Sequence, residues 1–175
     1  MEEGFLNPNQ ALNQLDLTSN MIAADFGSGS GGWAIPLAKI LKEGKVCAID
    51  ILKEPLSVLK GRAGSERALN IQTICSNIEN KGGSKLGDNS VDLVLMTNLL
   101  FQIENKKAVF LETKRILKNG GKILIVDWLP KAPLGPEKGR ISPEEVKKIA
   151  KDSGLKFEKE FKTGTHHYGV ILEKP

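Results

Sequence analysis

Residues 24–32 read ADFGSGSGG, and they follow directly on an apolar run that begins at Met21. The pattern is typical of a β-strand that ends in a glycine-rich turn and continues into a helix. Glycine has no side chain, so such a turn lets a ligand come close to the unpaired backbone amides at the start of the helix. In doubly wound α/β sheets this turn follows the first strand, where nucleotide-like ligands bind. The stretch therefore predicts both a fold class and a binding site.

Length and composition fit one soluble domain. The chain has 175 residues, of which 40% are hydrophobic, and a net charge of +4. We expect residues 1–175 to form a single domain, because a chain of this size buries about 70% of its unfolded surface. Residues 81–175 carry eighteen Lys and Arg against twelve Asp and Glu, a net charge of +6. Their lysines recur at helical spacings typical of solvated faces, so nucleic acid is a possible partner that is not favoured.

No metal site, disulfide or membrane span is expected. The two cysteines, Cys47 and Cys75, lie in apolar β-like runs and lack the spacing of a zinc site. No apolar stretch approaches the roughly 18 residues of a membrane helix, and the first residues are acidic and polar rather than a secretion signal. These features predict a cytoplasmic protein.

The chain beyond the glycine stretch alternates between strand-like and helix-like segments. Strands are expected at 21–26, 45–50, 70–75, 90–98 and 122–127, and helices at 8–17, 32–44, 53–67 and 104–118. The strands are apolar on both faces, as parallel strands covered by helices should be. Asn119–Gly121 is interpreted as a left-handed stop that ends the helix 104–118.

The C-terminal part predicts a reversal in the sheet. A Pro- and Gly-rich segment, 129–140, precedes a capped helix that opens at Ser142–Glu145. Residues 155–161 and 166–173 read as strands, and the connection between them is too short for a parallel crossover, which needs about a dozen residues or more. The predicted fold is α/β, a Rossmann-like doubly wound sheet of seven strands, mostly parallel with an antiparallel last strand.

Two ligand-binding patterns overlap in the glycine stretch. Residues 27–32 fit the dinucleotide fingerprint G-x-G-x-x-G, with Asp50 about 20 residues later as a carboxylate for a ribose. The same stretch also fits D-x-G-x-G-x-G, from Asp25 to Gly31.

On the second pattern the chain resembles the class I S-adenosylmethionine-dependent methyltransferases over nearly its whole length. Arg115–Gly121 (RILKNGG) is similar to the R-x-L-K-P-G-G run before the family's fifth strand, with Asn119 in place of the proline. The family's last strand is reversed and inserted beside the fifth, whereas dinucleotide Rossmann domains are parallel. An NAD-binding oxidoreductase is thus the less favoured alternative. Within the family, the chain is similar to small-molecule enzymes of the ubiquinone and menaquinone biosynthesis type.

The resemblance implies S-adenosylmethionine as cofactor and suggests which residues bind it. The glycine stretch would contact the methionine part, and Asp50 would accept hydrogen bonds from both ribose hydroxyls. Asn77 would meet the adenine amine, with Ile78 packed on the ring. The expected cofactor-binding residues are Asp25, Phe26, Gly27, Ser28, Gly29, Gly31, Asp50, Ile51, Asn77, Ile78, Asn98 and Leu99.

The methyl acceptor is expected beyond the carboxyl ends of the fourth and fifth strands. Asn98–Phe101 (NLLF) resembles the D/N-P-P-Y/F turn of methyltransferases that modify amino groups of nucleic acids, but both prolines are missing. Asp127 is interpreted either as a general base or as a strand-end carboxylate without catalytic duty. Trp128 either stacks on a planar acceptor or closes the rim of the core. His166 and His167 are expected to be structural.

These patterns predict an enzyme that moves a methyl group to a small-molecule acceptor. Transfer from a sulfonium is an in-line displacement that depends mainly on the positioning of the two reactants. An RNA or protein methyltransferase of the same fold is one alternative. A non-catalytic module that only binds S-adenosylmethionine is another.

Overall fold

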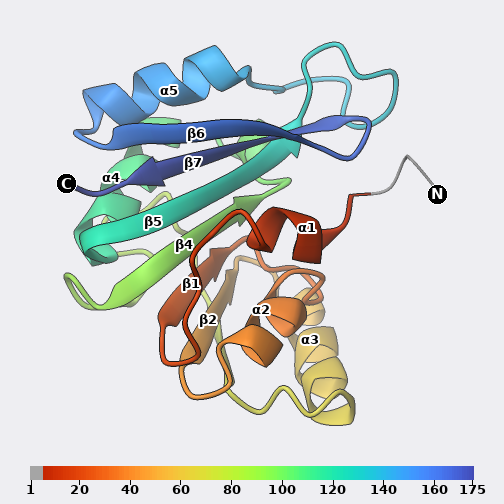
Figure 1. The fold of residues 1–175 in the computed structure, drawn as a ribbon. Coiled ribbons are helices and arrows are strands. Elements are labelled where there is room, and N and C mark those ends of the chain that lie inside the picture. The colour runs from red at the N-terminus through yellow and green to blue at the C-terminus, as the bar shows by residue number, and fades with distance from the viewer. Residues whose placement is uncertain (1–5) are drawn as a thin grey trace.

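The computed structural model describes residues 6–175, which form a sheet of seven strands in the order β3-β2-β1-β4-β5-β7-β6 (Figure 1). Residues 1–5 of the predicted domain lie outside the described part. The strands are β1 (Ile22–Phe26), β2 (Lys45–Asp50), β3 (Ile71–Cys75), β4 (Val91–Thr97), β5 (Leu117–Trp128), β6 (Lys156–Thr163) and β7 (His167–Glu173).

Helices cover both faces of this sheet. They are α1 (Pro8–Leu12), α2 (Ala34–Ile40), α3 (Lys53–Ser65), α4 (Lys106–Ile116) and α5 (Pro143–Asp152), with a 3-10 turn η1 (Leu100–Gln102). The hydrophobic core residues of α1, α2 and α3 belong to one cluster, and those of α4 and α5 belong to the other. The architecture is therefore doubly wound, as the sequence predicts.

The directions of the strands confirm the predicted reversal. Strands β1 to β5 are parallel, while β7 lies between β5 and β6 and is antiparallel to both. The helix before this hairpin begins as expected, because Ser142 and Glu145 form a reciprocal capping box at the start of α5. All five parallel strands consequently end at one edge of the sheet.

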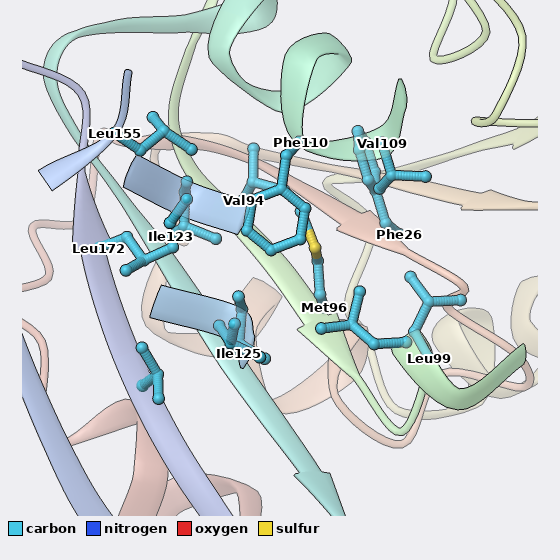
Figure 2. Packing of buried hydrophobic residues seen from close by; sticks show 14 of the residues in the cluster. Phe26, Val94, Met96, Leu99, Val109, Phe110, Ile123, Ile125, Leu155 and Leu172 are labelled. Atoms are coloured by element: carbon cyan, nitrogen blue, oxygen red, sulfur yellow. The ribbon is translucent and has the colours of Figure 1, made fainter. Parts of the chain in front are cut away.

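The larger core cluster packs α4 and α5 against the sheet. Figure 2 shows Phe110 of α4 beside Val94 and Met96 of β4 and Ile123 of β5, with Phe26 of β1 nearby. All five side chains are fully buried. Val94 and Met96 point to this face and their neighbours in the chain point to the other, as strand alternation requires. The strands are apolar on both faces for that reason.

The expected helix stop at Asn119–Gly121 is wrong. Helix α4 ends at Ile116, and Leu117 already has extended backbone angles of φ −68° and ψ 138°. The pairing of β4 with β5 then shifts from Val91–Leu117 to Leu93–Lys122, so the glycines lie in a bulge of β5. A glycine with a left-handed backbone is favourable both in a β-bulge and at the end of a helix. The same sequence pattern therefore fits both structures.

Two predicted helices are shorter than expected. The segment 8–17 is helical only over α1, and the segment 32–44 only over α2. Gly44 is needed for close packing rather than for helix termination, because its α-carbon packs directly on the backbone of Met21, just before β1. A side chain at this position would push the connection before β2 away from the sheet.

Candidate active site

A cavity of about 330 Å³ lies where the parallel strands end. Its walls come from the segments that follow four neighbouring strands. Its lining includes Gly27 and Gly29 after β1, Asp50 and Ile51 at and after the end of β2, Asn77 and Ile78 after β3, and Leu99 after β4. The structure thus brings together seven of the residues that the sequence assigns to cofactor binding.

The glycine turn has a left-handed backbone at Gly27, Gly29 and Gly31, with φ of +71°, +53° and +94°. At Gly27 the close neighbour belongs to the protein itself, because an added Cβ would lie 2.7 Å from a methyl carbon of Leu99. Gly31 likewise packs on Leu59. An added Cβ on Gly29 would meet no described atom within 4 Å. Of these three left-handed glycines, Gly29 is therefore the one that leaves free space for a ligand.

Both carboxylate oxygens of Asp50, at the floor of the cavity, accept hydrogen bonds from backbone amides. One carboxylate oxygen accepts from the N–H of Gly29 at 2.9 Å, and the other accepts from the N–H of Leu52 at 3.0 Å. Each oxygen keeps lone-pair capacity for a further donor. The half-buried carboxylate can therefore accept hydrogen bonds from hydroxyl groups of a ligand.

Asp25 lies completely buried below the glycine turn. Neither carboxyl oxygen has a hydrogen-bond partner in the described chain, and the same is true of the buried hydroxyl of Ser28. Burial, together with the nearby charge of Asp50, raises the pKa of Asp25 to about 8. This carboxyl is therefore mostly protonated at neutral pH.

The segment after β3 forms the opposite wall. Ile78 is buried, while Ile51 across the cavity is exposed at the rim. The side-chain oxygen of Asn77 accepts from the N–H of Glu79 at 2.9 Å and shapes the turn. The carboxylate of Glu79 in turn accepts from two backbone amides before α4, at 3.0 and 3.3 Å. Glu79 thus ties this wall to the start of α4.

Phe26 and Asn98 face away from the cavity. Phe26 is fully buried in the core (Figure 2). Asn98 follows β4 with a left-handed φ of +49°, and its Oδ1 lies 2.9 Å from Nε2 of His167 at the start of β7. Burial lowers the pKa of His167 to about 4, so the ring is neutral and its Nε2–H donates to Asn98. The sequence places these two residues 69 positions apart, and nothing in it predicts this contact.

Asp127 has both carboxylate oxygens occupied by the backbone. They accept from the N–H groups of Leu100 and Trp128, both at 2.8 Å, and the side chain is 1% exposed. Burial raises the pKa of Asp127 despite these hydrogen bonds. This arrangement fits an anchor for the turn after β4.

Trp128 packs within the chain. Its ring lies 4.1 Å from that of His167, centroid to centroid, at an interplanar angle of 40°. The backbone of Gly135 also packs on the indole, because an added Cβ would lie 2.5–2.8 Å from three of its ring atoms. Much of the indole surface is therefore used to hold the segment 129–140 against the sheet.

Arg140, which no sequence motif singles out, organises the segment 129–140 after β5 (Figure 1). Its guanidinium donates to the backbone carbonyls of Leu129, Pro130, Ala132, Leu134 and Pro136. Prolines lack a backbone N–H, so a proline-rich loop has more carbonyls than its own amides can satisfy. A single arginine inside a proline-rich loop is therefore the sequence feature that could have indicated the role of Arg140.

Within residues 6–175, no group of three or more His, Cys, Asp or Glu side chains is arranged to hold a metal ion. Over the same residues, no helix has the length and apolar character needed to cross a membrane.

Residues 24–125 match the family model described as a methyltransferase domain, which covers more than half of the chain. The chain belongs to this methyltransferase family. A solved structure of an S-adenosylmethionine-dependent methyltransferase from Aquifex aeolicus is 25% identical, with a TM-score of 0.87 over 95% of this chain and 89% of that one. These matches confirm the predicted class I methyltransferase and its cofactor, S-adenosylmethionine. They do not support an NAD-binding oxidoreductase.

Two curated methyltransferases are similar over most of the chain. The arsenite methyltransferase of Halobacterium salinarum is 26% identical over 123 residues, which are 70% of this chain and 30% of that protein. Phosphoethanolamine N-methyltransferase 3 of Arabidopsis thaliana is 27% identical over 135 residues, which are 74% of this chain and 26% of that protein. The chain therefore spans less than a third of the length of either relative.

The residues at the cavity fit the methyltransferase cofactor. S-Adenosylmethionine supplies a methyl group bound to a sulfonium sulfur. The sulfur is a good leaving group when the methyl group is transferred. Asp50 would accept hydrogen bonds from its ribose, and Ile51 and Ile78 offer apolar surface to its planar base. Asp25 and Ser28 do not line the cavity, and their buried polar atoms lack a hydrogen-bond partner in the described chain.

Replacing Asp50 with alanine tests the proposed ribose contact. We expect Asp50→Ala to cost about 1.5–3 kcal/mol of cofactor binding, or roughly 10- to 100-fold in Kd, because hydrogen bonds to charged groups are lost. Calorimetric titration with S-adenosylhomocysteine measures the change. Asp152→Ala, at the exposed end of α5, is the matched control. An unchanged Kd in Asp50→Ala would refute the role.

Replacing Gly29 with valine tests the close approach of the ligand. We expect Gly29→Val to abolish cofactor binding in a folded protein, with a stability loss of about 1–2 kcal/mol from left-handed strain. Gly120→Val, in the β5 bulge, carries similar strain at φ +77° and also has open space around it. Circular dichroism and titration of both variants separate folding from binding. Retained binding in folded Gly29→Val contradicts the expectation.

The buried acid predicts a pH-dependent stability. Because the pKa of Asp25 rises from 3.8 to about 8 on folding, the folded state holds a proton that the unfolded state loses. The free energy of unfolding should therefore fall between about pH 4 and 8, by at most about 1.4 kcal/mol per pH unit from this group. Asp25→Asn should remove this slope and be more stable than the parent at pH 7–8. Urea denaturation across this pH range measures the free energy of unfolding of both proteins. A steeper loss of stability with pH in Asp25→Asn than in the parent would contradict the expectation.

Proposed function

We propose that the protein methylates a small molecule. The observation that carries this proposal is the composition of the cavity wall. In the part of the chain that the structure describes, no residue that lines the cavity is Lys or Arg, while Asp50 and Glu79 are acidic. Binding of RNA depends largely on basic contacts to phosphates. On the side of the cavity next to the proposed acceptor, after β4, the lining residues Leu99, Gln102 and Ile103 are uncharged, which favours an acceptor without a phosphate backbone.

The names of the relatives also support a small acceptor. Their names specify arsenite and phosphoethanolamine, which are both small molecules. Arsenic(III) binds thiolates, and this chain has two cysteines. Cys47 is buried in β2, whereas Cys75 is exposed at the end of β3, so the two thiols do not form a pair that could hold arsenic. We therefore favour an acceptor other than arsenite.

The acceptor would lie beside the turn after β4. Methyl transfer needs the acceptor atom in line with the methyl group at near-attack distance, and it does not need a protein nucleophile. We propose that Asp127 acts as a positioning residue that fixes Leu100 and the turn, because both of its oxygens already accept backbone amides. Asn98 and the neutral His167 would form the polar border on the side of β7.

An acceptor screen tests the proposed function. The purified protein is incubated with S-adenosylmethionine and with pools of small amines, thiols, phenols and carboxylic acids, or with bulk RNA or protein. We expect S-adenosylhomocysteine to form only with a small-molecule pool, and Asp50→Ala to reduce that rate at limiting cofactor. Turnover with RNA or protein alone would contradict the proposal. Cofactor binding without turnover in any pool would favour the non-catalytic module.

A further inference from the structure

The two edges of the sheet differ in how they are protected against pairing with another chain. Strand β6, at one edge, carries five charged side chains in its eight residues, and its pairing with β7 shifts after Phe157. Charged side chains and bulges are usual devices that keep an edge strand from accepting a further strand. Strand β3, at the other edge, reads IQTIC and has no charged residue. Only the edge at β6 therefore carries these protective features.

The backbone of β3 has unpaired groups on its outer side. The N–H of Ser76, directly after the strand, donates to the carbonyl of Asp50 on β2. Backbone groups alternate in direction along a strand, so every second residue before Ser76 also faces β2 and the residues between them face outward. The outward residues are Ile71, Thr73 and Cys75, and within residues 6–175 their backbone groups have no hydrogen-bond partner. These three residues define the open edge of the sheet.

Exposed apolar side chains lie at both ends of the open edge. Leu69, two residues before β3, is 82% exposed. Ile51 lies beside the last residue of β3, because its carbonyl is 3.6 Å from Sγ of Cys75, and its side chain is 61% exposed. Leu52, the next residue along the chain, is 56% exposed. Each end of the strand therefore has apolar surface that a single chain leaves in water.

We propose that two copies of this chain form a dimer by pairing β3 with β3, antiparallel, about a twofold axis at Thr73. This axis sets Thr73 opposite itself and Ile71 opposite Cys75 of the second copy, with reciprocal backbone hydrogen bonds in each pair. The start of one strand then lies beside the end of the other, so Leu69 of each copy packs near Ile51 of its partner. A strand with exposed apolar residues at both ends is thus complementary to itself.

The charges around β3 favour the same antiparallel pairing. Before the strand, Glu66 is paired with Lys39 at 2.7 Å, while the exposed Arg67 has no ion pair in the described part of the chain. At the end of the strand, Asp50 and Glu79 line the cavity together with no Lys or Arg from residues 6–175. The twofold axis places the basic start of each β3 near the acidic end of the other. This charge complementarity favours a second copy as the partner.

The dimer would add a side chain of the second copy to the border of the cofactor cavity. Ile51 and Leu52 belong to the lining of this cavity, and they are the residues that Leu69 of the other copy approaches. The proposed interface is therefore continuous with the rim of the site. It is independent of which acceptor is methylated.

Charge-swapped variants at the twofold axis test the proposed pairing. Thr73→Lys and Thr73→Glu each set like charges opposite each other in a homodimer, whereas a mixture of the two can form Lys–Glu pairs. Analytical ultracentrifugation of the whole chain measures the mass and the dimer Kd. We expect the parent to reach twice the 19.1 kDa of one chain. Each variant alone should dimerise about tenfold more weakly or worse, and an equimolar mixture should form the dimer again.

Lys162→Glu, at an exposed position of β6, is the matched control and should dimerise as the parent does. Circular dichroism shows whether each variant is folded. A monomeric parent would overturn the proposal, as would a parent dimer that neither Thr73 variant weakens. Folded, monomeric Thr73 variants that do not combine when mixed would also contradict a twofold axis at this residue.

Amide hydrogen exchange of the parent is a second measurement that needs no variant. The N–H groups of Ile71, Thr73 and Cys75 are bonded only in the dimer, so their exchange should slow as the protein concentration is raised through the dimer Kd. The N–H groups of Gln72 and Ile74 face β2 in both states and should not change. Exchange of the outward amides that stays fast at all concentrations would refute the interface. These results involve neither cofactor nor acceptor, so they are distinct from a failure of the proposed methylation.

Discussion

The hydrogen bond between the N–H of Gly29 and the carboxylate of Asp50 links the two segments on which the cavity depends. Because β1 and β2 are parallel and paired in register, with Phe26 opposite Ile49, the turn after one strand lies beside the end of the other. The amides of Gly27 and Ser28 add two bonds to the carbonyl of Ile49, at 2.8 and 3.0 Å. The glycine turn is thus held open by the strand next to it.

The remaining walls are positioned by similar contacts between neighbouring strand ends. Glu79 joins the segment after β3 to the start of α4, and Asp127 joins the end of β5 to the turn after β4. Each contact uses a carboxylate to accept backbone amides that would otherwise lack partners. Carboxylates near this site therefore serve mainly as structural acceptors, and Asp25 differs from them because no donor reaches it.

Features that depend on local pattern could be predicted from the sequence. The apolar runs predicted the parallel strands, and the short connection before His166 predicted the reversed hairpin. The glycine turn and Asp50 predicted the floor of the cavity. Contacts between distant segments could not be predicted. The pairing of Asn98 with His167 depends on β7 lying beside β5, and the bulge at Gly120 depends on how β5 meets β4. Local sequence patterns do not show which strands lie side by side or which of their residues pair.

The loop 129–140 has a consequence for how this protein could change its specificity. Its path is determined by carbonyl oxygens that converge on the guanidinium of Arg140, and every residue type supplies a carbonyl. Side chains along the outside of the loop, such as the exposed Leu134, take no part in this arrangement. They can vary while the backbone keeps its course. Evolution can therefore alter the surface beside the proposed acceptor position, residue by residue, without having to rebuild the loop that carries it.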